Sequence, residues 1–304
     1  MSTATLPAPP PTWLPVSVLL FSASLWGLSW WPLKQFSAAG LSGPWLALLT
    51  YGVVGLCGLP FLWRERRQWR AQLKLLILLG LIGGWANAAF VNALVLGQVV
   101  RVMLLFYLSP VWAVLGGKLF LNEDIGWRRA LAVALALAGA FLVIGGPAAF
   151  EQPFSLSDLL ALSAGMGFAG NNIVARAAQG VPMLSKTITV FVGCGLVSVA
   201  MLAWQLTPAA VVVPSLQMGA GLLAYGFIWL ALATATWQFG VTHMESGRAG
   251  VILIAELLVA VLSSTLLGEE HLSASEWCGG ALIAAAALLE TTGASPSPAC
   301  TAAT

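Results

Sequence analysis

The sequence predicts an all-α membrane protein of ten transmembrane helices, on three grounds: composition, the lengths of its apolar stretches and the placement of its basic residues. Of the 304 residues, 59% are hydrophobic and only 8% are charged, whereas a soluble domain carries about 25% charged residues. Ten crossings of about 20 residues each would use roughly 200 positions. The composition therefore argues against a water-soluble domain and fits a helical protein that crosses the bilayer many times.

Glycine, proline and charge clusters divide the apolar part of the chain into stretches that each approach the length needed to cross a bilayer. The candidate spans are residues 14–33, 44–63, 74–97, 100–120, 127–146, 156–178, 184–206, 217–241, 247–267 and 273–290. The links at 97–100 and 243–246 are so short that each predicts a tight helical hairpin. Polar tails at 1–12 and 292–304 frame the spans, and we expect both tails to be disordered.

Basic residues predict the orientation, because cytoplasmic loops retain lysine and arginine. If both termini are cytoplasmic, only Lys34 and Arg101 of the 13 basic residues fall outside. The 11 that fall on the cytoplasmic side are Arg64, Arg66, Arg67, Arg70, Lys74, Lys118, Arg128, Arg129, Arg176, Lys186 and Arg248. The sequence therefore predicts a multi-pass protein of the inner (cytoplasmic) membrane, with its N- and C-termini inside.

The chain also carries an internal repeat. A shift of 147 residues superposes Arg101 on Arg248 and Glu123 on Glu270, and charged residues are rare in this sequence. The shift divides the spans into a first five-helix repeat, residues 13–147, and a second, residues 148–291. An odd number of spans per repeat places the two halves in opposite orientations. Inverted repeats of this kind are typical of secondary transporters, which bind substrate near the midplane between the halves.

Each half of the chain carries a short motif followed at a distance by a further residue. The first half carries Leu108–Pro110 followed by Glu123, and the second carries Leu267–Glu270 followed by Gly279. These paired motifs resemble the signatures of EamA-type members of the drug/metabolite transporter superfamily. The resemblance covers residues 13–290. It implies ten helices in two inverted five-helix halves and the export of small metabolites.

Within that superfamily, the size and the tryptophan content most resemble the YddG-type exporters of aromatic amino acids. Trp26 and Gly27 in the first span fit this resemblance. One position departs from the duplicated pattern, because Leu257, preceded by Glu256, stands where the first half has Pro110. A kink inferred from Pro110 therefore does not carry over to the ninth span.

Glu256 is the sharpest single signal, because it lies near the middle of an apolar span. Placing an ionisable group there costs about 2.5–3.5 kcal/mol of membrane-insertion free energy, so such a group usually faces a cavity or a partner. Glu256 could be the counter-charge for a substrate ammonium or a proton-coupling site. It could instead be a neutral carboxyl that joins two spans by hydrogen bonds. The small residues Ala260, Ser263 and Ser264 share its helical face and predict a close approach to another helix, under either interpretation.

Uncharged polar and aromatic side chains at comparable depth complete the candidate site. The predicted substrate-binding residues are Trp26, Trp30, Asn87, Tyr107, Asn171, Thr234, Trp237, Gln238 and Glu256. The amide and hydroxyl groups could hold an amino acid backbone, or they could form ordinary interhelical hydrogen bonds. The aromatic rings could stack on a planar or apolar side chain, although such rings also form interfacial belts. Trp26 and Trp30 are expected one turn apart on a single helix.

Three functions fit the sequence. The first is a secondary exporter of small metabolites, aromatic or other apolar amino acids above all, that works by alternating access. The second is an exporter of hydrophobic cations or drugs with Glu256 as the cation or proton site. The third is a non-transporting receptor or interaction protein. The expected partners are an amino acid substrate and the lipid bilayer; the oligomeric state stays open, and a monomer is compatible with the sequence.

Other functional classes lack their sequence signatures. His243 and His271 have no HExxH motif around them, and the chain has neither GxSxG nor a glycine-rich phosphate loop. We therefore expect no enzyme, no catalytic residues, no metal site and no cofactor. The scattered basic residues form no stripe for nucleic acid, so nucleic-acid binding is not expected.

Overall fold

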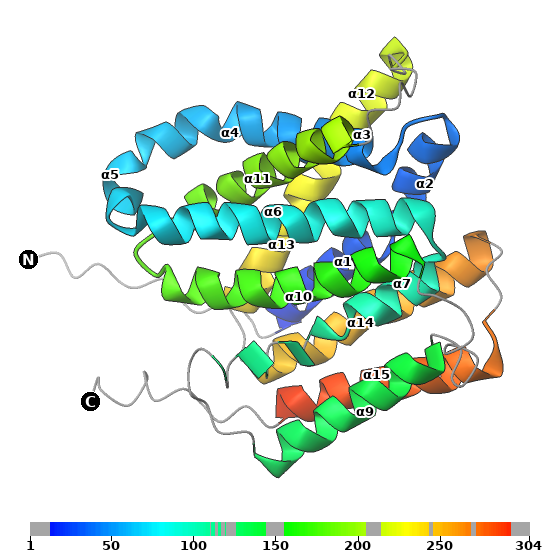
Figure 1. The fold of residues 1–304 in the computed structure, drawn as a ribbon. Coiled ribbons are helices and arrows are strands. Elements are labelled where there is room, and N and C mark those ends of the chain that lie inside the picture. The colour runs from blue at the N-terminus through cyan, green and yellow to red at the C-terminus, as the bar shows by residue number, and fades with distance from the viewer. Residues whose placement is uncertain are drawn as a thin grey trace, which may run out of the picture.

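The computed structural model describes residues 13–109, 111–112, 115–116, 119, 126–143, 155–204, 214–242, 246–268 and 272–292. Every secondary-structure element in these ranges is a helix (Figure 1). This confirms the predicted all-α class. The predicted terminal tails, residues 1–12 and 292–304, lie outside the described residues apart from Thr292, which ends a helix, and the motif residues Pro110, Glu123 and Glu270 lie outside them too.

The first half of the chain folds into long helices interrupted by short turns. Its elements are α1 (Trp13–Gly27), α2 (Trp30–Ala38), α3 (Gly43–Ala47), the π-helix η1 (Leu48–Gly52), α4 (Val53–Arg64), α5 (Arg66–Trp69), the 3-10 turn η2 (Arg70–Gln72), α6 (Leu73–Leu96), α7 (Val99–Phe106) and α9 (Trp127–Val143). Only Gly97 and Gln98 separate α6 from α7, so the link predicted at 97–100 is a tight hairpin.

The second half contributes a similar set of long helices. Its elements are α10 (Leu156–Ala177), α11 (Met183–Trp204), α12 (Leu216–Ala224), the π-helix η4 (Tyr225–Leu230), α13 (Ala231–Thr242), α14 (Ser246–Leu267) and α15 (Ala274–Thr292). The segments α12, η4 and α13 follow one another without a break. The link predicted at 243–246 falls mostly outside the described residues.

Several helices meet the requirements of a membrane span. Within the described part of the chain, five stretches are long and apolar enough to cross a bilayer. They are Leu14–Ala38, Gly43–Arg64, Arg66–Leu96, Met183–Trp204 and Leu216–Trp237. Shorter apolar helices cover Ala130–Val143 and Ala255–Leu267. Large apolar side chains such as Leu56, Leu196 and Ile228 are exposed on these helices, which suits a lipid environment.

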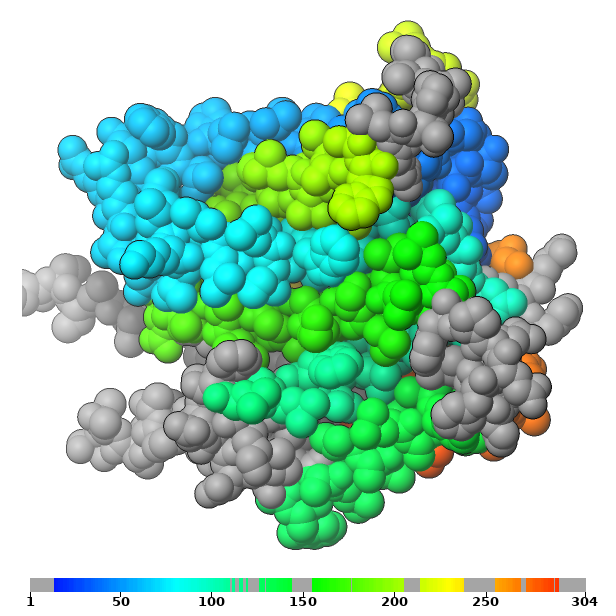
Figure 2. All heavy atoms as spheres, viewed as in Figure 1, coloured from blue at the N-terminus to red at the C-terminus, as the bar shows by residue number. Residues whose placement is uncertain are grey.

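Close helix packing builds the core. The helix α6 packs against both α10 and α11, and α9 packs against α15. In the space-filling view, α6 and α10 lie against each other along the visible face (Figure 2). A Cβ on Gly139 of α9 would stand 2.6 Å from the Gly279 carbonyl oxygen, and a Cβ on Gly279 would stand equally close to that of Gly139. Paired glycines let these two backbones touch, as in many membrane-helix interfaces.

Polar contacts tie helix ends together at both ends of the bundle. At one end, Lys34 Nζ donates to the Gly97 carbonyl oxygen at 2.7 Å and joins α2 to the end of α6. At the other end, the Ser185 hydroxyl donates to Glu65 Oε2 at 2.5 Å, and Lys186 Nζ donates to the Ala175 carbonyl oxygen at 2.7 Å. The first pair lies where the sequence predicts the outer face, and the others lie where it predicts the cytoplasmic face.

Candidate functional site

The structure brings Glu256 and Tyr107 together. Tyr107 follows the last residue of α7, and its hydroxyl donates a hydrogen bond to the Glu256 carboxyl on α14. The neighbouring residues Leu257 and Ala260 are 3% and 0% exposed. Glu256 itself is surrounded by protein, yet it keeps a partly accessible surface. This contact links the first half of the chain to the second.

Gly27 brings the helix α1 into contact with the backbone at Glu256. A Cβ on Gly27 would stand 2.7 Å from the Glu256 carbonyl oxygen and 2.9 Å from Val259 Cβ. A side chain at this position would therefore push α1 away from α14. The buried small residues Ala260, Ser263 and Ser264 complete this closely packed face of α14, as the sequence predicts.

Trp26 and Trp30 do not lie on one continuous helix, which corrects the sequence-based expectation. The helix α1 ends at Gly27, and α2 begins at Trp30 after the turn residues Leu28 and Ser29. Pro32 causes the interruption, because it has no N–H to donate to the Leu28 carbonyl four residues earlier. That carbonyl accepts from the Trp31 N–H instead, at 3.1 Å.

The two tryptophans consequently have different surroundings. Trp26 is half-buried at the end of α1. Trp30 is only 4% exposed, and its indole N–H donates to the Ser263 hydroxyl on α14 at 2.9 Å. On the other side of the break, the Trp229 indole N–H in η4 donates to the Leu25 carbonyl oxygen at 3.0 Å. Side chains from α14 and η4 thus brace the interruption in the first span.

The predicted asparagines form a second polar group between α6 and α10. Asn87 Nδ2 donates to the Gly83 carbonyl oxygen of its own helix at 2.8 Å. Asn171 Oδ1 packs directly over Gly83 from α10. Within the described residues, this buried Asn171 oxygen has no hydrogen-bond partner. It is therefore an acceptor that a donor on a ligand or a water molecule could satisfy.

The remaining predicted residues lie on α13, which packs against α1. The Thr234 hydroxyl donates to the Leu230 carbonyl oxygen of its own helix at 2.7 Å. Trp237 is half-buried one turn further along. The side chain of Gln238 lies outside the described residues. Of the predicted residues whose side chains are described on this helix, Trp237 keeps accessible surface and makes no hydrogen bond within the helix.

Three phenylalanines that sequence reasoning missed lie together beside Tyr107, on the helices α6, α7 and α10. Phe106 on α7 lies 4.7 Å from Phe90 on α6 and 5.4 Å from Phe168 on α10, measured between ring centroids. Phe106 also contacts the Tyr107 ring, with centroids 6.0 Å apart. All three phenylalanines are half-buried. We call Phe90, Phe106 and Phe168 the phenylalanine cluster.

Helical spacing could have found two members of this cluster. Phe90 lies three residues after Asn87, and Phe168 lies three residues before Asn171. Residues three apart share a helix face. Each asparagine therefore marks a face that carries an aromatic ring one turn away.

The model of the EamA-like transporter family matches residues 13–145 and again residues 155–292. The chain belongs to the EamA-like transporter family. It is accordingly a multi-pass membrane protein of a transporter family.

Relatives of this EamA-like protein agree with that assignment. A Bacillus subtilis (strain 168) protein named "Uncharacterized transporter YwfM" is 29% identical over 173 residues, which cover 57% of this chain. The alignment spans 55% of that relative, so the chain matches about half of its length. A solved structure titled only "Crystal structure of protein" aligns with a TM-score of 0.58 at 20% identity. The alignment covers 91% of this chain and 96% of the chain in that structure. That likeness shows a shared fold.

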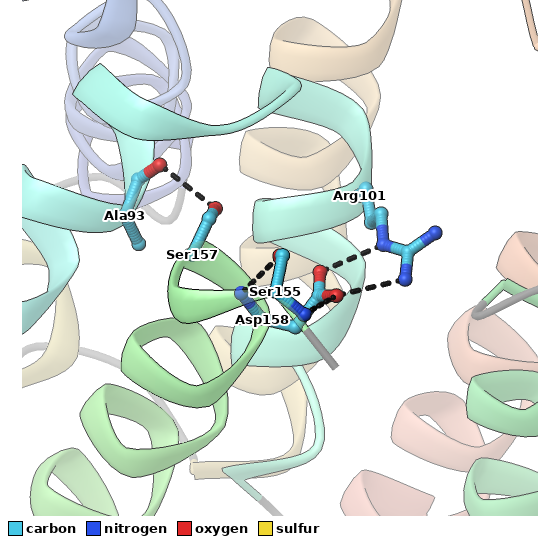
Figure 3. Close-up of polar contacts among 5 residues, drawn as sticks. All are labelled: Ala93, Arg101, Ser155, Ser157 and Asp158. Carbon is cyan, nitrogen blue, oxygen red and sulfur yellow. Dashed lines mark hydrogen bonds and ion pairs between the residues drawn. The ribbon is translucent and has the colours of Figure 1, made fainter. Parts of the chain in front are cut away.

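The end of this transporter that carries Lys34 also holds an ion pair between α7 and α10. Arg101 Nε and Nη2 donate to the two carboxylate oxygens of Asp158 at 2.7 and 2.8 Å (Figure 3). Asp158 also completes a capping box with Ser155 at the start of α10. Beside it, the Ser157 hydroxyl donates to the Ala93 carbonyl oxygen of α6 at 3.1 Å.

Proposed function

We propose that this EamA-like transporter is a secondary exporter of small metabolites, namely amino acids with aromatic or other apolar side chains. The observation that carries the proposal is the Glu256 carboxyl, which accepts from Tyr107 at a contact between the two halves of the chain. A carboxylate in this position would bind a substrate ammonium by a charge-assisted hydrogen bond.

The surrounding side chains supply the other contacts that such a substrate needs. The phenylalanine cluster, which begins beside Tyr107, offers ring faces and edges for stacking on a planar or apolar side chain. Asn171 Oδ1 offers an unsatisfied acceptor at the far side of the cluster. An amino acid of this class has both an ammonium group for Glu256 and an aromatic or apolar side chain for the phenylalanine cluster. The two contacts together therefore favour it over a molecule that has only one of these groups.

We further propose ten spans arranged as two inverted repeats, residues 13–147 and 148–291, that rock against each other. Helix contacts support this arrangement, because they recur at equivalent positions in the halves. The third span packs on the sixth (α6 on α10), as the eighth packs on the first (α13 on α1). The fourth span packs on the sixth (α7 on α10), as the ninth packs on the first (α14 on α1). Rocking of one half against the other would expose Glu256 to each side in turn.

A test of the exported substrate uses intact cells. Cells that express the protein are expected to release phenylalanine, tyrosine or tryptophan faster than control cells. Trp237→Ala should weaken this release more than Trp127→Ala, because Trp237 is half-buried beside α1 whereas Trp127 is 71% exposed. Release equal to the control would contradict amino acid export, and equal effects of the two substitutions would contradict a substrate contact at Trp237.

A separate test concerns the orientation, with both termini inside the cell. A cysteine introduced at Arg67 should resist an impermeant thiol reagent in intact cells, and one at Ala39 should react. Ala39 suits this test because it is exposed and its backbone φ is −81°. The adjacent Gly40 has φ of 99°, which a cysteine would strain. Labelling with the opposite sidedness would overturn the orientation.

A second candidate function is the export of hydrophobic cations or drugs. The observation that favours it is the same carboxyl beside aromatic rings, because both groups attract a cation. Competition separates the two functions. If hydrophobic cations block amino acid release while N-acetylated amino acids, which lack the ammonium charge, do not, the carboxyl recognises a positive charge that both substrate classes share. If cations are released and amino acids are not, the second candidate replaces the first.

A further inference from the structure

The ion pair between Arg101 and Asp158 joins the two halves of the chain at one end of the bundle. Arg101 lies in the first turn of α7, and Asp158 lies in the first turn of α10. The Asp158 side chain is 2% exposed and the Arg101 side chain 28%. Two parallel hydrogen bonds between a guanidinium and a carboxylate give a geometrically specific contact.

The position of Arg101 is electrostatically unfavourable within its own helix, and the charge of Asp158 compensates for this. The N-terminus of a helix carries partial positive charge, which disfavours a basic side chain in the first turn. Asp158 offsets this charge because it faces the guanidinium and caps α10 at the same time. The contact therefore depends on α7 and α10 starting side by side at this end.

Two other hydrogen bonds lie near the ion pair, but neither joins charged groups of the two halves. The hydrogen bond from Ser157 to Ala93 also crosses between the halves, but it joins two uncharged groups. The hydrogen bond from Lys34 to Gly97 lies at the same end but connects two helices of the first half. Among these contacts, the ion pair is the charged one that joins the two halves of the chain.

The internal sequence repeat duplicates the arginine of this pair but not its aspartate. The shift of 147 residues matches Arg101 with Arg248, but it matches Asp158 with Pro11. Residues 1–15, which lead into the first span, contain no aspartate or glutamate. The arginine is thus duplicated and its acidic partner is not.

We propose that Arg101 and Asp158 form a one-sided latch that holds shut the end of the transport path where α7 and α10 begin. In the proposed orientation this is the outer end, so the resting transporter faces the cytoplasm and must break the pair to release substrate. The inference rests on the proposed alternating access. It makes Arg101 and Asp158 gating residues that do not touch the substrate.

Thiol labelling in liposomes tests the latch. The reporter is Val102→Cys, in a protein whose native cysteines are replaced, because Val102 is fully buried beneath the Gly97 turn. With the pair intact, an impermeant maleimide on the latch side should react slowly. Asp158→Asn should raise the labelling rate at least roughly tenfold, because a hydrogen-bonded charge pair between the halves is lost.

Lys34→Gln is the matched control, because it removes a charged contact at the same end within one half. It should leave the labelling rate unchanged. Arg101→Gln provides a second route to the same result, and the double variant with Asp158→Asn should label no faster than either single variant.

Two results would overturn the latch. One is an unchanged labelling rate in Asp158→Asn protein that remains monodisperse, which would leave the pair with a structural role only. The other is an equal rise in Lys34→Gln, which would indicate general loosening of this end. Labelling needs no substrate, so absence of amino acid transport would contradict the proposed function without affecting this measurement.

Discussion

Glu256→Gln is expected to reduce amino acid flux at least roughly tenfold while leaving the folded yield in membranes nearly intact. The substitution keeps the shape of the side chain and removes its charge, and a hydrogen bond to a charged group is worth about 1.5–3 kcal/mol. The Tyr107 hydroxyl can still donate to the glutamine amide oxygen, so the contact between α7 and α14 survives. Flux into liposomes and the yield of monodisperse protein are the two measurements.

Glu256→Leu separates the functional role of this carboxyl from a structural one. Leucine removes the acceptor that Glu256 offers to Tyr107, and the loss of such a hydrogen bond costs about 0.5–1.5 kcal/mol. This variant should therefore lose yield as well as flux. Normal flux in Glu256→Gln combined with poor yield in Glu256→Leu would eliminate substrate binding by Glu256 and assign recognition to the uncharged groups.

Gly27→Ala is expected to destabilise the protein, because the new Cβ would collide with the Glu256 carbonyl oxygen and Val259. Overpacking of this kind costs about 1–3 kcal/mol. The collision involves backbone, so a rotamer change cannot relieve it. Thermal unfolding in detergent should show a lower melting temperature, and flux should fall because α1 is displaced from the site.

Gly219→Ala is the matched control for this effect. Gly219 lies inside the helix α12, and a Cβ there would meet no atom within 4 Å. Alanine favours a helix interior by up to about 1 kcal/mol over glycine, so the melting temperature should stay the same or rise. Similar unfolding of the two variants would contradict the close approach of α1 to α14.

The sequence predicts much of this fold, because apolar length and charge placement act locally. Within the described residues, most helix starts and ends lie within a few residues of the predicted spans, although the first span continues to Ala38 rather than ending at residue 33. Glu256 faces a partner, as its cost in a bilayer requires. The interruption at Leu28 and Ser29 was missed, although Pro32 is its visible cause. The apolar length of a span does not show whether its helix is continuous, so length alone could not reveal this break.

The site was harder to predict, because its contacts join distant parts of the chain. Asn87 and Thr234 bond to carbonyls of their own helices, and no sequence pattern separates that use from substrate binding. The phenylalanine cluster becomes visible only once α6, α7 and α10 are known to be neighbours. The partner of Arg101 lies 57 residues away, and the internal repeat gave no hint of it because Asp158 has no acidic counterpart.

Exchange of labelled phenylalanine across the membrane of liposomes that contain the purified protein tests amino acid transport and the role of Glu256 together. Liposomes preloaded with unlabelled phenylalanine should accumulate the label, protein-free liposomes should not, and Glu256→Gln liposomes should do so at least roughly tenfold more slowly. Equal accumulation with and without the protein would contradict amino acid transport. Equal rates for the wild-type protein and Glu256→Gln would contradict the binding of the substrate ammonium at Glu256.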